Sequence, residues 1–145
     1  MKERGNRPVR EYVGAVFAAG LAHLRARGDI PREYTLVPAP TRPRSARARG
    51  GDPVSAVCHA AAQHQRVGVC AALTMGQSTA DQSELNAQDR WANLQGRVRV
   101  RAPIAQGPAL LADDVITTGA TLAASIAALQ AAGVEVCGAL VFADA

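Results

Sequence analysis

Two adjacent carboxylates followed by a run of hydroxyl groups are the residues of this sequence best suited to chemistry. Asp113 and Asp114 come directly after the apolar run 109–112, and the segment 117–121 reads Thr-Thr-Gly-Ala-Thr. Carboxylates accept hydrogen bonds from hydroxyl groups. Small residues that open a helix present backbone N–H groups to an anion, and Gly119 would let a phosphate approach the backbone closely. The pattern therefore predicts a site for a ligand that carries both hydroxyls and a phosphate.

A purely structural explanation competes with this interpretation. In that explanation Asp113 and Asp114 only end a strand, and Thr117 only caps a helix. An acid pair alone would not separate the two explanations. The complete succession of apolar strand, acid pair, hydroxyl-rich turn and amphipathic helix favours a ribose 5-phosphate site, in which the carboxylates bind the vicinal hydroxyls and the turn binds the phosphate.

The elements that must position these residues alternate between helices and strands. Apolar spacing predicts helices over residues 9–27, from Asp52-Pro53 to Gly68, and from about Thr121 to Gly133. Short apolar runs predict strands over 34–39, 69–73, 109–112 and 134–142. Val98 and Val100 alternate with arginines, as in an exposed strand or a hairpin arm. This order predicts an α/β fold with a mainly parallel central sheet and helices on both faces. The acid pair would then lie at the carboxyl edge, where such sheets place their sites.

Two polar stretches surround the expected site. One holds four arginines within eight residues, namely Arg42, Arg44, Arg47 and Arg49, and reads either as an anion-binding loop or as a solvated basic loop. The other, residues 74–97, is rich in Gln, Asn, Asp and Ser and has too thin an apolar stripe for a core element. Its Arg90 is either a cation for the ligand or a surface charge, and Trp91 is first of all a packing residue.

Composition places the chain among ordinary single domains. Its 145 residues suit one domain over residues 1–145, with an N-terminal helical part within 1–30 and a core over 34–143. Hydrophobic residues make up 48%, yet no run approaches the roughly 18 apolar residues of a membrane span. No secretory signal is recognisable, and three scattered cysteines without zinc spacing favour a reducing, cytoplasmic location. The net charge of +4 suits an anionic ligand.

The segment 110–122 resembles the PRPP-binding motif of type I phosphoribosyltransferases, and the resemblance implies that fold. It also implies that Asp113 and Asp114 bind the ribose hydroxyls of PRPP and contact Mg²⁺, through water or directly. The phosphate would bind at Val115, Thr117, Thr118, Gly119, Ala120 and Thr121. The pyrophosphate would bind at Ala39, Pro40, Thr41 and Arg42. Residues 74–97 would form a mobile loop over the reacting centre, and Arg90 of this loop would assist the departure of the pyrophosphate.

Further matches narrow the resemblance to the ComF family of competence-associated phosphoribosyltransferase-like proteins. These matches are the run 36–40, Arg49-Gly50, and the spaced residues Gln82, Leu85, Arg90, Asn93 and Gly96. The chain departs from the family in two places. No cysteine precedes Cys58, so the usual N-terminal zinc ribbon is missing, and residues 49–53 read Arg-Gly-Gly-Asp-Pro instead of Arg-Gly-Phe-Asn-Gln.

Two hypotheses of function follow from these residues. The first is a transferase that moves a phosphoribosyl group from PRPP to an acceptor, with binding lost in the double variant Asp113→Asn/Asp114→Asn. The alternative is a non-catalytic ComF-like module for DNA uptake, which would bind single-stranded DNA or competence proteins. Its binding to DNA would fall steeply with salt and would be lost when the four arginines of 42–49 become alanine. A homodimer is compatible with either hypothesis, and no residue pattern specifies it.

Overall fold

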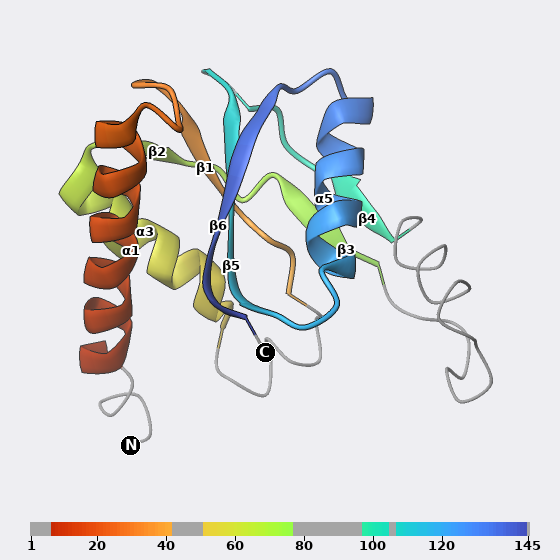
Figure 1. Ribbon diagram of the computed structural model, residues 1–145. Coiled ribbons are helices and arrows are strands. Elements are labelled where there is room, and N and C mark those ends of the chain that lie inside the picture. The colour runs from red at the N-terminus through yellow and green to blue at the C-terminus, as the bar shows by residue number, and fades with distance from the viewer. Residues whose placement is uncertain (1–6, 42–50, 77–96, 105–106, 145) are drawn as a thin grey trace.

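Four parallel strands form the centre of the molecule in the computed structural model (Figure 1), which describes residues 7–41, 51–76, 97–104 and 107–144. The strands are β1 (Thr35–Pro38), β2 (Gly68–Val69), β5 (Ala109–Ile116) and β6 (Val136–Asp144). Their order in the sheet is β2-β1-β5-β6, and every neighbouring pair is parallel. The expectation of an α/β fold with a parallel central sheet is therefore confirmed.

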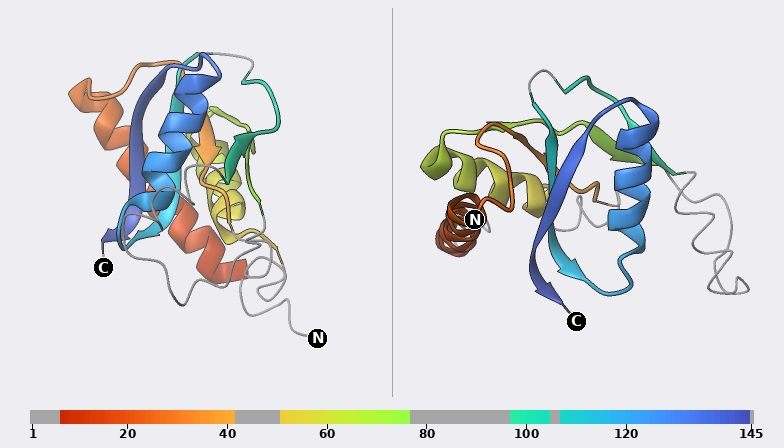
Figure 2. Two further views of the ribbon diagram at one scale, coloured as in Figure 1. Left: turned by 90° about the vertical axis from the view of Figure 1, so that its right-hand side faces the viewer. Right: turned by 45° about the horizontal axis from the view of Figure 1, so that its top comes forward.

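Helices cover both faces of this sheet. Helix α1 (Arg7–Arg27) and helix α3 (Pro53–Gln65) pack together on one face, whereas α5 (Ala120–Ala131) lies on the other (Figures 1 and 2). An antiparallel hairpin of β3 (Leu73–Met75) and β4 (Val98–Val100) packs beside α5. The hairpin arm expected at Val98 and Val100 is confirmed.

The core has two halves, one on each side of the sheet. Leu36 and Leu110 belong to the half under α1 and α3, and their chain neighbours Val37 and Leu111 belong to the half under α5. All four side chains are fully buried. Successive strand residues point to opposite faces, so the uninterrupted apolar runs seen in the sequence are what a sheet buried on both sides requires.

Two boundaries expected from the sequence are wrong. The second helix ends before Gly68, because Arg66 takes a left-handed conformation with φ 53° and its N–H bonds the carbonyl of Ala62. The run 69–73 is not one strand. Val69 pairs with Leu36 in the central sheet, whereas Leu73 pairs with Val100 in the hairpin. An apolar run identifies buried chain, but it cannot show that the chain passes from one sheet to another.

The strand that carries the acid pair is longer than expected. The sequence predicts its end at Ala112, yet β5 continues to Ile116 and pairs Asp113 with Val141 and Val115 with Ala143 of β6. On its other side β1 stops at Pro38, opposite Ala112. The two acids therefore lie in the part of β5 that extends past the end of β1, still at the carboxyl edge of the sheet.

Several sequence features lie outside the described residues. They are the arginines of 42–49 and nearly all of the polar stretch 74–97, including Arg90 and Trp91; only its first residues, in β3, and Arg97 are described. Within the described part of the chain, no helix is long and apolar enough to cross a membrane.

Candidate functional site

The carboxyl edge of the sheet brings the ends of β1 and β5 together with the first turns of α3 and α5. The N–H of Ala39 donates to the carbonyl of Ala112 at 2.8 Å, which holds the turn after β1 against the start of the acid pair. Ala39 and Pro40 are buried in this turn, and Thr41 is half-buried. Residues 39–41 and the acid pair, expected from the sequence to share a site, are thus adjacent.

A third carboxylate, Asp52, anchors this turn to helix α3. Its Oδ1 accepts from the N–H of Val54 at 3.1 Å as the helix N-cap, and from Oγ1 of Thr41 at 2.8 Å. The sequence predicts the cap, which is confirmed, but not the contact with Thr41. The place of Asp52 in the sequence was a signal for the contact with Thr41. Asp52 begins the helix that follows β1, so its side chain is expected at the carboxyl edge of the sheet.

Burial gives Asp113 an unusual protonation equilibrium. It raises the pKa of this carboxyl from 3.8 to about 6, because a partly buried carboxylate loses hydration. The N–H of Asp114, which donates to Oδ1 of Asp113 at 2.8 Å, opposes the rise. The side chain of Asp114 and the negative charges of Asp114 and Asp52 reinforce it. A ligand that offers hydroxyl donors or a cation would favour the ionised form of this carboxyl.

The turn after β5 leaves hydrogen-bond donors free for an anion. Gly119 is the N-cap of α5, with φ 70° and no side-chain cap hydrogen bond, and Thr118 Oγ1 accepts from the N–H of Ala120 only at 3.4 Å. The purely structural explanation predicts that Thr117 caps this helix. Thr117 is instead exposed and lies two residues before the N-cap, Gly119. The N–H groups of a first helical turn have no partner within the helix. A Cβ at Gly119 would meet nothing within 4 Å, so a ligand could approach the N-cap backbone on that side.

The donor set suits a hard cation that brings most of its own ligands. Asp113 and Asp114 offer carboxylate oxygens, which Mg²⁺ prefers. Among the described residues no group of three or more His, Cys, Asp and Glu side chains could hold a metal ion. The acid pair thus offers carboxylate oxygens to a hard cation such as Mg²⁺, which the sequence interpretation expects here.

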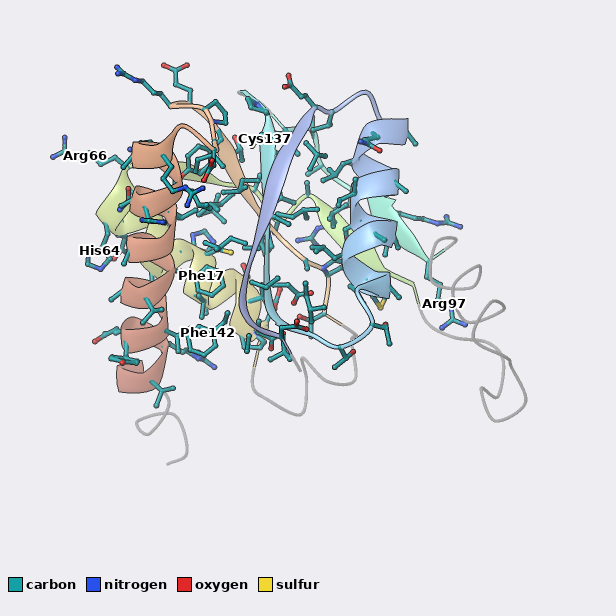
Figure 3. All side chains as sticks on the ribbon, viewed as in Figure 1. Phe17, His64, Arg66, Arg97, Cys137 and Phe142 are labelled. Carbon is teal, nitrogen blue, oxygen red and sulfur yellow. The ribbon has the colours of Figure 1, made fainter. Side chains whose placement is uncertain are left out.

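An apolar cavity of about 210 Å³ opens beside the acid pair, on the face covered by α1 and α3. Arg10, Asp113 and Asp114 supply its charged groups. Two of its apolar residues, Phe17 of α1 and Phe142 of β6, stack with ring centroids 6.3 Å apart (Figure 3). The rest of the lining is apolar and consists of Val9, Val13, Pro53, Val54, Val57 and Val115. Sequence reasoning missed this cavity, although apolar residues that continue past the acids in β5 were a signal for it.

The structure therefore gathers most of the expected site residues at one edge: residues 39–41, Asp113 to Val115, and 117–121. Arg42 and Arg90, expected to act there too, lie outside the described residues. No protein-family model matches the chain, and no curated protein matches it in sequence.

Proposed function

We propose that this protein binds PRPP with Mg²⁺ at the carboxyl edge of its sheet and transfers the phosphoribosyl group to an acceptor. One observation carries the proposal: Asp113 and Asp114 lie between the open N-terminus of α5 and the buried turn 39–41. The two carboxylates, which can accept from hydroxyl groups, thus stand between the first-turn N–H groups of α5 and this turn. Among the described residues of the turn, Thr41 has the one N–H not already engaged or absent, since the Ala39 N–H bonds to Ala112 and Pro40 has none. PRPP has the same order, with a 5-phosphate, two ring hydroxyls and a pyrophosphate.

Each group of the ligand has a matching group in the protein. The first-turn amides of α5 and the exposed hydroxyls of Thr117 and Thr118 would bind the 5-phosphate. The carboxylates of Asp113 and Asp114 would accept from the 2- and 3-hydroxyls, and the turn 39–41 would approach the pyrophosphate. Mg²⁺ supplies charge neutralisation at the pyrophosphate when it is bound. At neutral pH a carboxyl with a pKa of about 6 is mostly ionised and ready to accept.

The reaction would break the bond from C1 of the ribose to the pyrophosphate oxygen and form a bond from C1 to the acceptor. The described residues would contribute position and charge: they hold the ribose at two points while positive charge develops at the ring. The nearby carboxylates of Asp113 and Asp114 favour that charge. Electrostatic stabilisation of this kind needs no covalent contribution from the protein.

Titration calorimetry with PRPP and Mg²⁺ tests the proposal. We expect saturable PRPP binding that needs Mg²⁺. The affinity for PRPP should fall by at least about 100-fold in Asp113→Asn/Asp114→Asn, because two charge-assisted hydrogen bonds are lost. The matched control is Asp29→Asn, which removes an exposed carboxylate paired with Arg27 after the last turn of α1. Equal PRPP affinity in the double variant and the control would refute the site, and binding without pyrophosphate release in the presence of any acceptor would refute the transfer step.

A further inference from the structure

Among the described residues, no strand lies beside the outer edge of β6. β6 is an end strand of the sheet and has nine residues, whereas the opposite end strand, β2, has two. Its sequence, Val-Cys-Gly-Ala-Leu-Val-Phe-Ala-Asp, contains no proline and no basic residue. Natural sheets protect long edges with such residues, because unpaired backbone groups recruit another strand.

Helix α1 carries an exposed apolar stripe on the side that adjoins this edge. The stripe consists of Val9, Tyr12 and Val16, whose exposed fractions are 59%, 70% and 41%. Residues four apart share one side of a helix, so Val16 lies beside Gly20, where an added Cβ would meet Leu140 of β6 at 3.4 Å. Gly14 instead faces Ala60 of α3. The stripe is therefore on the β6 side of α1 and away from α3.

We propose that two copies of this chain associate through antiparallel pairing of β6 with β6, with α1 packing against α1. A two-fold axis normal to the sheet would join the two central sheets into one and keep both α1 helices on the same face. The two Val9–Tyr12–Val16 stripes would then meet across the axis. One symmetric contact would satisfy the open edge and cover the exposed apolar side chains, as an isologous interface requires.

The sequence of β6 is complementary to itself in this arrangement. With Leu140 on the axis, Gly138 of one copy stands opposite Phe142 of the other, because antiparallel partners have a constant sum of residue numbers. Phe142 is 46% exposed, and its ring would cover the bare glycine backbone across the strands. Asp144, the charged residue of β6, would stand opposite Val136, so no like charges meet. This match favours a second copy as the partner strand of the open edge.

The interface would also border the candidate site. Val9 and Phe142 belong both to the exposed apolar surface and to the lining of the cavity beside the acid pair. A second copy would therefore place its own apolar side chains next to the mouth of that cavity. The proposal does not depend on PRPP, and it goes beyond the function proposed above.

Sedimentation equilibrium combined with hydrogen exchange tests this interface. We expect a dimer at micromolar concentration and slower amide exchange in β6 as the protein concentration rises. Val16→Lys and Ala139→Lys, both at exposed positions, should each weaken dimerisation by about tenfold or more, since each places a charge in an apolar contact. Gln63→Lys is the matched control, because it adds the same group at an exposed position of α3.

Three results would overturn the proposal. They are a monomer at all accessible concentrations, a dimer that Val16→Lys and Ala139→Lys leave intact, and a dimer in which β6 exchanges as fast as in the monomer. Circular dichroism establishes that each variant is folded, and Tyr12→Lys replaces Val16→Lys if the latter does not fold. PRPP titration of the monomeric variants keeps this test separate from the proposed function, since those variants should retain PRPP affinity.

Discussion

At the scale of single residues, Asp113 should affect both ligand binding and the stability of the fold. The fold holds this carboxyl partly buried, next to two other acids, and raises its pKa to about 6. A surface aspartate would be ionised well below that pH at no cost to the fold. Because its pKa is raised, the ionised Asp113 destabilises the folded protein at neutral pH. Destabilising residues gather at functional sites, so this property agrees with a carboxyl group that binds a ligand.

Replacing Asp113 by asparagine should stabilise the protein at neutral pH while weakening PRPP binding. Between pH 4 and 6 the folded state holds a proton that the unfolded state has released, so the free energy of unfolding falls as pH rises through this window. Asparagine has no such proton. The variant should therefore gain about 1–2 kcal/mol over the natural chain at pH 7, and the gain should shrink toward zero near pH 4.

Urea denaturation at a series of pH values measures this difference. Asp29→Asn is the control, because Asp29 is an exposed carboxylate and its replacement should give no comparable gain at pH 7. A variant of Asp113 that is less stable than the natural chain at pH 7, or a gain that does not change with pH, would contradict the assignment of a raised pKa.

At the scale of elements, the sequence predicts helices and strands well where a single face or a continuous core decides them. The spacing in residues 9–27 predicts α1, and Asp52-Pro53 predicts the first turn of α3. The end of α3 was not predictable, because Arg66 takes a left-handed cap that glycine or asparagine usually fills. The length of β5 was not predictable either, since Asp113 and Asp114 read as a strand end until β6 is seen to pair beside them.

Asp52, the N-cap of α3, should stabilise the turn after β1 as well as the helix itself. Asp52→Ala removes acceptors for both the N–H of Val54 and the hydroxyl of Thr41, so we expect a loss of about 1–2 kcal/mol in the free energy of unfolding. Asp52→Asn keeps an acceptor oxygen and should lose less than half of that amount. It also removes a negative charge near Asp113, and the pKa of Asp113 should fall.

Chemical denaturation and carboxyl carbon NMR check the two parts of this prediction. Equal destabilisation by alanine and asparagine would mean that the carboxylate charge, and not the cap, stabilises α3. An unchanged pKa of Asp113 in Asp52→Asn would mean that Asp52 does not act on the acid pair.

At the scale of the whole molecule, the position of the candidate site follows from the parallel order of the strands, and this part could be predicted. Parallel strands bring residues 39–41 and 113–121 to one edge, although about 70 residues separate them in the sequence. The cavity could not be predicted, because it depends on how closely α1 approaches its neighbours. The open edge of β6 could not be predicted either, because it depends on the order of the strands in the sheet. Sequence periodicity shows which side of α1 is apolar, but it does not show that Val9, Tyr12 and Val16 stay exposed.

The contact between α1 and α3 should tolerate no added methyl group at Gly14. A Cβ there would lie 2.5 Å from Cβ of Ala60, and a short side chain on a helix cannot move aside, so the two helices must separate. We expect Gly14→Ala to lower the free energy of unfolding by about 1–2 kcal/mol, since overpacking outweighs the helix propensity gained. Gly20→Ala is the matched control on the same helix. Its Cβ would lie 3.4 Å from a flexible Leu140 side chain, so stability should stay unchanged or rise by up to about 1 kcal/mol. Urea denaturation of the two variants measures both signs, and a stabilised Gly14→Ala would show that α1 does not pack this closely on α3.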